Sequence, residues 1–171
     1  MPHSRLQTSF LTAVASLMLV SCSDQSSQEF SPTEINSEKS EKISVITTIG
    51  MITDPATIIA GDHAAVTGII GSGIDPHLYK PTRTDITKLM DANVVLYCGL
   101  MLEGRMTDAF VRVATSGTMV KAVTEAIDEA ALLSPPDFEG HHDPHLWMDP
   151  IAWTLATRVI ADTLARNPED D

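Results

Sequence analysis

The sequence predicts an α/β domain with a mostly parallel four-stranded sheet and flanking helices, and two observations carry this prediction. Short runs of β-branched or apolar residues alternate with segments whose apolar residues recur at helical spacing. The run Val94–Tyr97 is apolar throughout, which is typical of a strand buried on both faces of a parallel sheet. In such sheets ligands bind beyond the carboxyl ends of the strands. The fold class therefore also indicates where a site is expected.

The first part of the domain contains two strand signals with a helix signal between them. We expect strands within Ile43–Ile49 and Ala64–Ile70, where β-branched residues are frequent. Between them, Asp54 is predicted to cap a helix that has Pro55 at its first position, and Gly61 is predicted to end it.

The remaining elements follow from periodicity and from turn residues. A helix is expected to start within Pro81–Asp85, and another helix is expected after Glu103. The apolar residues that define their buried faces are Ile86, Leu89 and Met90 in the first, and Met106, Ala109, Phe110 and Val113 in the second. A fourth strand is predicted at Thr118–Val123 and a last helix at Ile151–Arg166, with Trp153, Ala156, Ile160 and Leu164 on one face.

The N-terminal segment is predicted to be a targeting signal followed by a linker. Phe10–Val20 is an apolar run too short to span a membrane as a mature helix, and it ends at the sequence LVSC, which resembles a bacterial lipobox. We therefore expect a lipoprotein signal peptide at 1–21 and lipidation of Cys22. Residues 22–41 are acidic and rich in serine with few large apolar residues, which predicts a flexible stalk.

Charge and cysteine content limit the function classes. The chain has 11 Lys and Arg against 23 Asp and Glu, a formal net charge of −12, which disfavours nucleic acid as a partner and favours cations. With Cys22 assigned to lipid, Cys98 remains alone, so we expect no internal disulfide and interpret Cys98 as a buried thiol.

A duplicated tetrapeptide is the main functional signal. The sequence Asp-Pro-His-Leu occurs at 75–78 and again at 143–146, and in each copy a proline stiffens the approach to the histidine. Neutral imidazole is a common transition-metal ligand, and a ligating ring usually donates its second N–H to a carboxylate or a carbonyl. His77 and His145 are therefore candidate metal ligands. Asp75, Asp143 and Asp149 are all candidates for the carboxylate partner.

Several motifs together resemble one protein family. They are TTIGM at 47–51, GIDPHLYKPT at 73–82, ANVV at 92–95, GLMLEG at 99–104 and DPHLW at 143–147. In this order they resemble the metal-binding lipoproteins of zinc and manganese ABC importers, the cluster A-I solute-binding proteins. The resemblance covers residues 42–171.

The resemblance implies an architecture and a ligand set. Members of the family have two α/β lobes joined by a long helix, with the metal between the lobes. The N-terminal lobe supplies two histidines, which by motif match are His77 and His145. We thus expect residues 42–171 to form the N-terminal metal-binding lobe, with the second lobe absent from this sequence. His141 and His142 are candidates for auxiliary metal gathering, as in relatives with a His-rich loop.

The implied function is that of a solute-binding protein and not of an enzyme. Such a lipoprotein captures Zn or Mn outside the cytoplasmic membrane and delivers it to an ABC permease, which is powered by a separate ATPase. The N-terminal lipid would attach it to the membrane. Two alternatives remain at this point: a truncated, transport-incompetent product or incomplete sequence of such a protein, and a zinc-dependent hydrolase that uses His145, His142 and Asp149.

Overall fold

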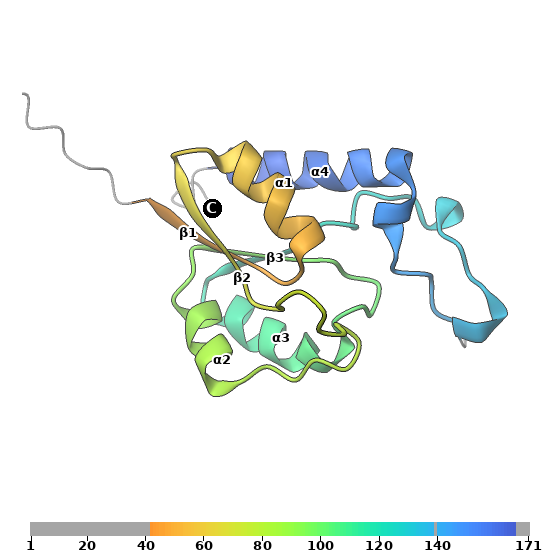
Figure 1. Ribbon diagram of the computed structural model, residues 1–171, viewed down its shortest axis with the longest axis horizontal. Coiled ribbons are helices and arrows are strands. Elements are labelled where there is room, and N and C mark those ends of the chain that lie inside the picture. The colour runs from red at the N-terminus through yellow and green to blue at the C-terminus, as the bar shows by residue number, and fades with distance from the viewer. Residues whose placement is uncertain (1–41, 139, 167–171) are drawn as a thin grey trace, which may run out of the picture. The chain divides into compact units, whose positions relative to one another are not determined.

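The computed structural model describes residues 42–138 and 140–166, which form an α/β unit (Figure 1). The predicted signal peptide at 1–21, the predicted lipidation site Cys22 and the predicted stalk at 22–41 lie outside the described residues. Among the helices that are described, none combines the length and the apolar character needed to cross a membrane.

The sheet confirms the predicted fold class. Its strands are β1 (Ile43–Thr47), β2 (Ala64–Gly68), β3 (Val94–Tyr97) and β4 (Met119–Ala122). They are arranged in the order β2-β1-β3-β4, and each neighbouring pair is parallel. The predicted strand positions are therefore correct: β3 has the predicted bounds, and the other three strands are shorter than their sequence signals.

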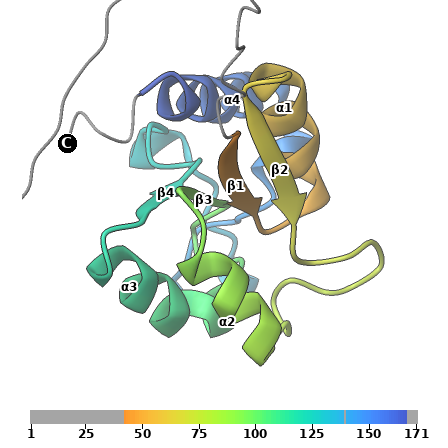
Figure 2. The ribbon, with the colours of Figure 1, turned by 90° about the vertical axis from the view of Figure 1, so that its left-hand side faces the viewer.

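Helices cover both faces of the sheet. They are α1 (Gly50–Ala60), α2 (Arg83–Met90), α3 (Thr107–Thr115) and α4 (Pro150–Leu164). Helices α1 and α4 lie on one face, and α2 and α3 lie on the other (Figure 2). Short 3-10 turns occur at Gly104–Met106, Glu129–Ala131, Pro136–Phe138 and Leu146–Met148. The two helical layers enclose the central strands, so Val45, Val95 and Leu96 have no exposed surface.

The predicted start of α1 is wrong. The helix begins at Gly50 and places Pro55 in its interior, where proline cannot donate a backbone hydrogen bond. Burial explains the earlier start, because Ile52 and Ala56 are fully buried four residues apart on the face toward the sheet. Packing of the first turn thus outweighs the cost of an interior proline. The predicted end at Gly61 is confirmed, and its φ of 52° is one that glycine adopts readily.

Helix α2 begins with a capping box that sequence reasoning located but did not name. The Thr82 hydroxyl accepts a hydrogen bond from the Asp85 backbone N–H, and the Asp85 carboxylate accepts one from the Thr82 backbone N–H. The Tyr79 hydroxyl donates to the same carboxylate at 2.7 Å. Although burial opposes it, these hydrogen bonds lower the pKa of Asp85. The carboxylate thus ties the end of the first histidine loop to α2.

The carboxyl ends of the strands form the edge at which the predicted site residues meet. The chain passes from β1 to β2 on one side and then returns past β1 to β3, so the strand order reverses between β1 and β3. Both histidine motifs follow outer strands: His77 comes after β2, and His145 comes after β4. The two loops therefore approach the reversal point from the two outer strands, on opposite sides of the sheet.

Candidate metal centre

The structure brings together the two histidines that the duplicated motif singled out. The Nε2 atoms of His77 and His145 are 3.5 Å apart, although 68 residues separate them in sequence. Their ring centroids lie 5.4 Å apart with the planes inclined by 55°. Two imidazole nitrogens thus point toward one place at the carboxyl edge of the sheet.

Each copy of the motif makes the same local turn. The Asp75 carboxylate accepts a hydrogen bond from the His77 backbone N–H, and the Asp143 carboxylate accepts one from the His145 backbone N–H, both at 2.9 Å. An aspartate that bonds to the backbone two residues later closes a compact turn, and the intervening proline fixes its φ. The repeated sequence therefore forms the same turn twice, and each turn holds one histidine at its end.

The carboxylate partner, which the sequence left open among three aspartates, is Asp143. Its Oδ1 lies 2.6 Å from Nδ1 of His145, whereas Asp149 caps α4 and the Asp75 bond is to the backbone. The backbone and ring hydrogen bonds from His145 lower the pKa of Asp143. A charged Asp143 holds the proton on Nδ1, which leaves the lone pair of His145 on Nε2, facing His77.

The separation of the two nitrogens suits a shared metal ion. The usual zinc–imidazole distance is about 2.1 Å. If an ion lay at that distance from both nitrogens, the nitrogen–ion–nitrogen angle across the 3.5 Å separation would be roughly 113°, close to the tetrahedral angle. Within residues 42–138 and 140–166, no three His, Cys, Asp or Glu side chains are grouped to hold an ion together. The described residues thus provide a paired-imidazole half-site.

Two aromatic side chains flank the His145 ring, and a buried thiol contacts the residue before it. Trp147 and Phe138 lie edge-on to it, with centroids at 5.1 and 6.4 Å. Below the motif, the fully buried Cys98 thiol lies 3.6 Å from the Pro144 carbonyl oxygen, to which it donates. Cys98 is therefore the buried thiol that the sequence predicted, and it contacts the residue that precedes His145.

A buried carboxylate fastens the reversal point of the sheet, and sequence reasoning gave it no role. Glu103 accepts hydrogen bonds from the Thr48 hydroxyl at 2.6 Å and from the backbone N–H groups of Cys98 and Gly99. Burial raises the pKa of Glu103 in spite of these bonds. The carboxylate thereby joins the ends of β1 and β3 below the histidine loops. The sequence signal was its place in the motif GLMLEG at 99–104, to which no contact was assigned.

The turn that Glu103 fastens requires glycine at its first position. Gly99 has a φ of 96°, and a Cβ there would lie 2.6 Å from the Thr124 hydroxyl oxygen. Leu100 and Met101 also have positive φ values, 50° and 65°, which non-glycine residues seldom adopt. The Glu103 hydrogen bonds hold the ends of this strained turn.

The structure does not place His141 and His142 with the histidine pair. His142 Nδ1 lies 2.9 Å from the Ser134 hydroxyl, and its Nε2 lies 3.4 Å from the Glu129 carboxylate. Their role in metal gathering stays a prediction. The hydrolase alternative required His145, His142 and Asp149 around one ion, but these three residues have separate partners. The observed geometry therefore does not favour a hydrolytic centre.

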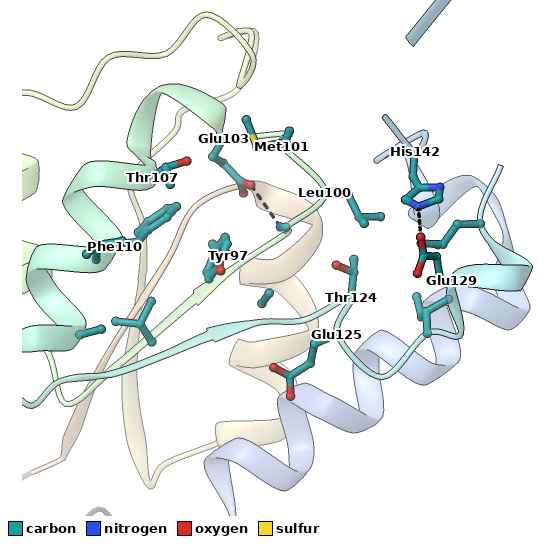
Figure 3. Close-up of a pocket in the computed structure, with 17 residues that line it drawn as sticks. Tyr97, Leu100, Met101, Glu103, Thr107, Phe110, Thr124, Glu125, Glu129 and His142 are labelled. Carbon is teal, nitrogen blue, oxygen red and sulfur yellow. Dashed lines mark hydrogen bonds and ion pairs between the residues drawn. The ribbon is translucent and has the colours of Figure 1, made fainter. Parts of the chain in front are cut away.

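A cavity of about 650 Å³ lies between α3, β4 and the loop that follows β4 (Figure 3). Tyr97 and Phe110 stack along one wall with centroids 4.4 Å apart. Of its acidic residues, Glu125 pairs with Lys121 and Glu129 pairs with His142. Neither His77 nor His145 lines the cavity, so it is separate from the histidine pair.

Fold and site together define a class: an α/β lobe whose outer-strand loops carry paired imidazoles to the carboxyl edge of a parallel sheet. The chain belongs to the family described as zinc-uptake complex component A, periplasmic, whose model matches residues 45–171. This finding confirms the resemblance drawn from the sequence motifs.

Two relatives each match about 70% of the chain. The manganese-binding lipoprotein MntA of Bacillus subtilis is 41% identical over 121 residues, which are 70% of this chain and 39% of the relative. The zinc-binding protein TroA of Treponema pallidum is 38% identical over 122 residues, 71% of this chain and 39% of the relative. The chain thus spans about two fifths of the length of these relatives.

Solved structures show the same lobe. The periplasmic zinc-binding protein TroA from Treponema pallidum superposes with a TM-score of 0.69 at 38% identity, covering 72% of this chain and 44% of that one. A manganese-bound periplasmic metal-binding protein from Candidatus Liberibacter asiaticus gives a TM-score of 0.64 at 27% identity, covering 72% and 45%. The matched portion is one lobe of a two-lobed architecture, which confirms the expected fold.

Proposed function

We propose that this chain is the metal-binding lobe of a solute-binding lipoprotein that captures Zn or Mn outside the cytoplasmic membrane for uptake through an ABC permease. His77 and His145 are its ligands, and Asp143 orients the His145 ring. The observation that carries the proposal is the 3.5 Å separation of the two Nε2 atoms, since they face one point from two separate loops.

The relatives support the same chemistry. Those named above are described as binding manganese or zinc, and the family description refers to zinc uptake at a periplasmic location. Capture and delivery need reversible binding and no chemical step, so the chain is proposed to act as a binding protein and not as an enzyme. Its partners would be the permease and the ATPase that drives it. The net charge of −12 favours a cation as cargo and disfavours nucleic acid.

The domain organisation is part of the proposal. Residues 1–21 would be a signal peptide, Cys22 the lipidated residue, 22–41 a flexible stalk and 42–171 the lobe. A buried acyl chain contributes about 0.8 kcal/mol per methylene, so lipid on Cys22 would hold the lobe at a membrane surface. Replacing Cys22 with serine should abolish incorporation of a labelled fatty acid. Unchanged labelling would contradict the assignment.

The direct test of the site is a zinc and manganese titration by calorimetry at neutral pH. His77→Ala and His145→Ala should each weaken binding at least tenfold, because each removes one of two ligands. His63→Ala is the matched control, since His63 is exposed but precedes β2 at the opposite, amino edge of the sheet. Equal affinity in all four proteins would refute the ligand assignment.

A further inference from the structure

The second histidine loop is joined to the sheet through the residue that follows β3. Cys98 has no exposed surface, and each of its polar groups has a partner. Its backbone N–H donates to Glu103 at 2.9 Å, its carbonyl oxygen accepts from the Thr124 hydroxyl at 2.8 Å, and its thiol donates to the Pro144 carbonyl oxygen at 3.6 Å. The last of these contacts joins the end of β3 to the residue that precedes His145.

The Pro144 carbonyl oxygen also closes the turn that presents His145. It accepts a hydrogen bond from the Leu146 backbone N–H at 2.9 Å, so His145 is the central residue of a three-residue turn. The φ of −82° and ψ of 48° at His145 are close to those of an inverse γ-turn. Pro144 and Leu146 are both buried. The direction in which the imidazole leaves the backbone therefore depends on where this one oxygen is held.

We propose that Glu103 is a positioning residue for His145 and acts through Cys98. The Glu103 Oε1 atom accepts hydrogen bonds from both the Thr48 hydroxyl and the Cys98 backbone N–H. One buried oxygen thus links the end of β1 to the residue whose thiol reaches the histidine loop. The inference rests on the proposed function, because it concerns the same candidate ligand, but Glu103 itself is not assigned as a ligand.

The strained turn between Cys98 and Glu103 explains why a buried carboxylate is needed there. Leu100 and Met101 both have positive φ values, a conformation that persists only where the surrounding structure holds it. Glu103 lies beside this turn and accepts from the N–H groups at its start (Figure 3). Without these bonds the turn could relax, and Cys98 would shift away from the Pro144 carbonyl oxygen.

A shift of this kind would matter because the two candidate ligands must meet at one point. Their Nε2 atoms are 3.5 Å apart, and a binding site of this type has to be held within about 0.5 Å by the residues behind it. Asp143 fixes the rotation and the tautomer of the His145 ring. Glu103 and Cys98 are assigned the complementary task, which is to fix the backbone that carries the ring.

Zinc competition with a chromophoric chelator tests the inference in the full chain with Cys22→Ser, in which Cys98 is the remaining thiol. Glu103→Leu removes every acceptor and should weaken binding at least about tenfold. Glu103→Gln should retain most of the affinity, because an amide oxygen in place of Oε1 can accept the same two bonds. Cys98→Ala removes a weak hydrogen bond and should cost about two- to fivefold. Combining Cys98→Ala with Glu103→Leu should cost no more than Glu103→Leu alone, since both act along one route.

Val113→Ala is the matched control for lost stability. Val113 is fully buried in the last turn of α3, which leads into β4 and so lies toward the amino edge of the sheet. This variant should unfold more easily and keep the parent affinity. Amide hydrogen exchange of the metal-free chain, followed by NMR, gives a second measurement. The Leu146 N–H should exchange faster in Glu103→Leu and Cys98→Ala, and at the parent rate in Glu103→Gln and Val113→Ala.

The outcomes separate the two proposals. A parent chain that binds no zinc would overturn the proposed function, while the exchange of the Leu146 N–H would still decide whether Glu103 and Cys98 hold the turn. Equal loss of affinity in Glu103→Leu and Val113→Ala would overturn the inference, because it would report stability alone. Additive losses in the double variant would overturn the route through Cys98. If Glu103→Leu fails to fold, Cys98→Ala decides, and parent affinity with parent exchange in that variant would overturn the inference.

Discussion

Replacing Asp143 with alanine tests how strongly the carboxylate beside His145 tunes the proposed metal site. Asp143 makes a backbone hydrogen bond that closes the turn and a 2.6 Å bond to Nδ1 of the ring. The second bond fixes the tautomer that leaves Nε2 free to coordinate. Loss of such a partner typically weakens metal binding by about 10- to 100-fold, or roughly 1.4–2.7 kcal/mol.

The duplicated motif provides the matched control. Asp75 closes the same turn before His77 with a 2.9 Å backbone bond, and it makes no ring bond like that of Asp143. Asp75→Ala should therefore weaken binding less than about threefold, below roughly 0.7 kcal/mol. The difference between the two alanine variants isolates the contribution of the ring bond.

Competition against a chromophoric chelator at micromolar protein measures both affinities under one condition. Asp143→Asn adds a third point, because an amide oxygen can still accept from Nδ1 but carries no charge, and an intermediate loss is expected. Equal losses in Asp75→Ala and Asp143→Ala would refute the argument, since they would show that the turns matter and the ring bond does not. Unchanged affinity in Asp143→Ala would refute it outright.

Three further predictions concern pH, stability and reactivity. Metal affinity should fall as the solution is made mildly acidic, because ligating imidazoles must be deprotonated; chelator competition from pH 8 to about 5.5 would check this, and a flat profile would count against both histidines. Asp85→Ala should lower the free energy of unfolding by about 1–3 kcal/mol in urea, since it removes the acceptor for Thr82 and Tyr79. Because the folded state lowers the pKa of Asp85, the stabilisation is complete above the ordinary pKa of the carboxyl and should be lost as pH falls through the lowered value. If parent and variant kept the same difference in free energy of unfolding down to strong acid, the assignment would be wrong. Burial raises the pKa of the Cys98 thiol, so in a Cys22→Ser chain a thiol reagent at neutral pH should label Cys98 only after denaturant is added, and rapid labelling of that folded chain would contradict the burial.

The strands and most helices could be predicted because their signals are local. Val94–Tyr97 is apolar throughout, and the residues predicted to face the core from α3 are buried. The start of α1 was misplaced because Asp54-Pro55 is a strong local start signal, whereas the burial of Ile52 in the core depends on the folded chain. Met90 was assigned to a buried face but is 39% exposed, since the short helix α2 turns that position outward at its last residue.

The candidate ligands could be found from sequence, but their surroundings could not. Repetition of Asp-Pro-His singled out His77 and His145 without any knowledge of their distance. Choosing Asp143 over Asp75 depends on how each imidazole is rotated, and aromatic neighbours that come together only in the fold surround the His145 ring. Glu103 was missed for a similar reason, because its partner Thr48 lies 55 residues away.

The two tryptophans beside His145 give the molecule an optical reporter of its own. Trp147 lies 5.1 Å from the His145 ring and Trp153 lies 6.5 Å from Trp147, and these are the two tryptophans of the whole chain. All tryptophan fluorescence therefore comes from Trp147, which contacts the His145 ring, and from Trp153, which contacts Trp147. Protonation of that imidazole, or its capture by an ion, changes the electric field and the quenching that the first indole experiences. Ligand exchange at this edge can thus be followed in real time by intrinsic fluorescence, without attaching a dye.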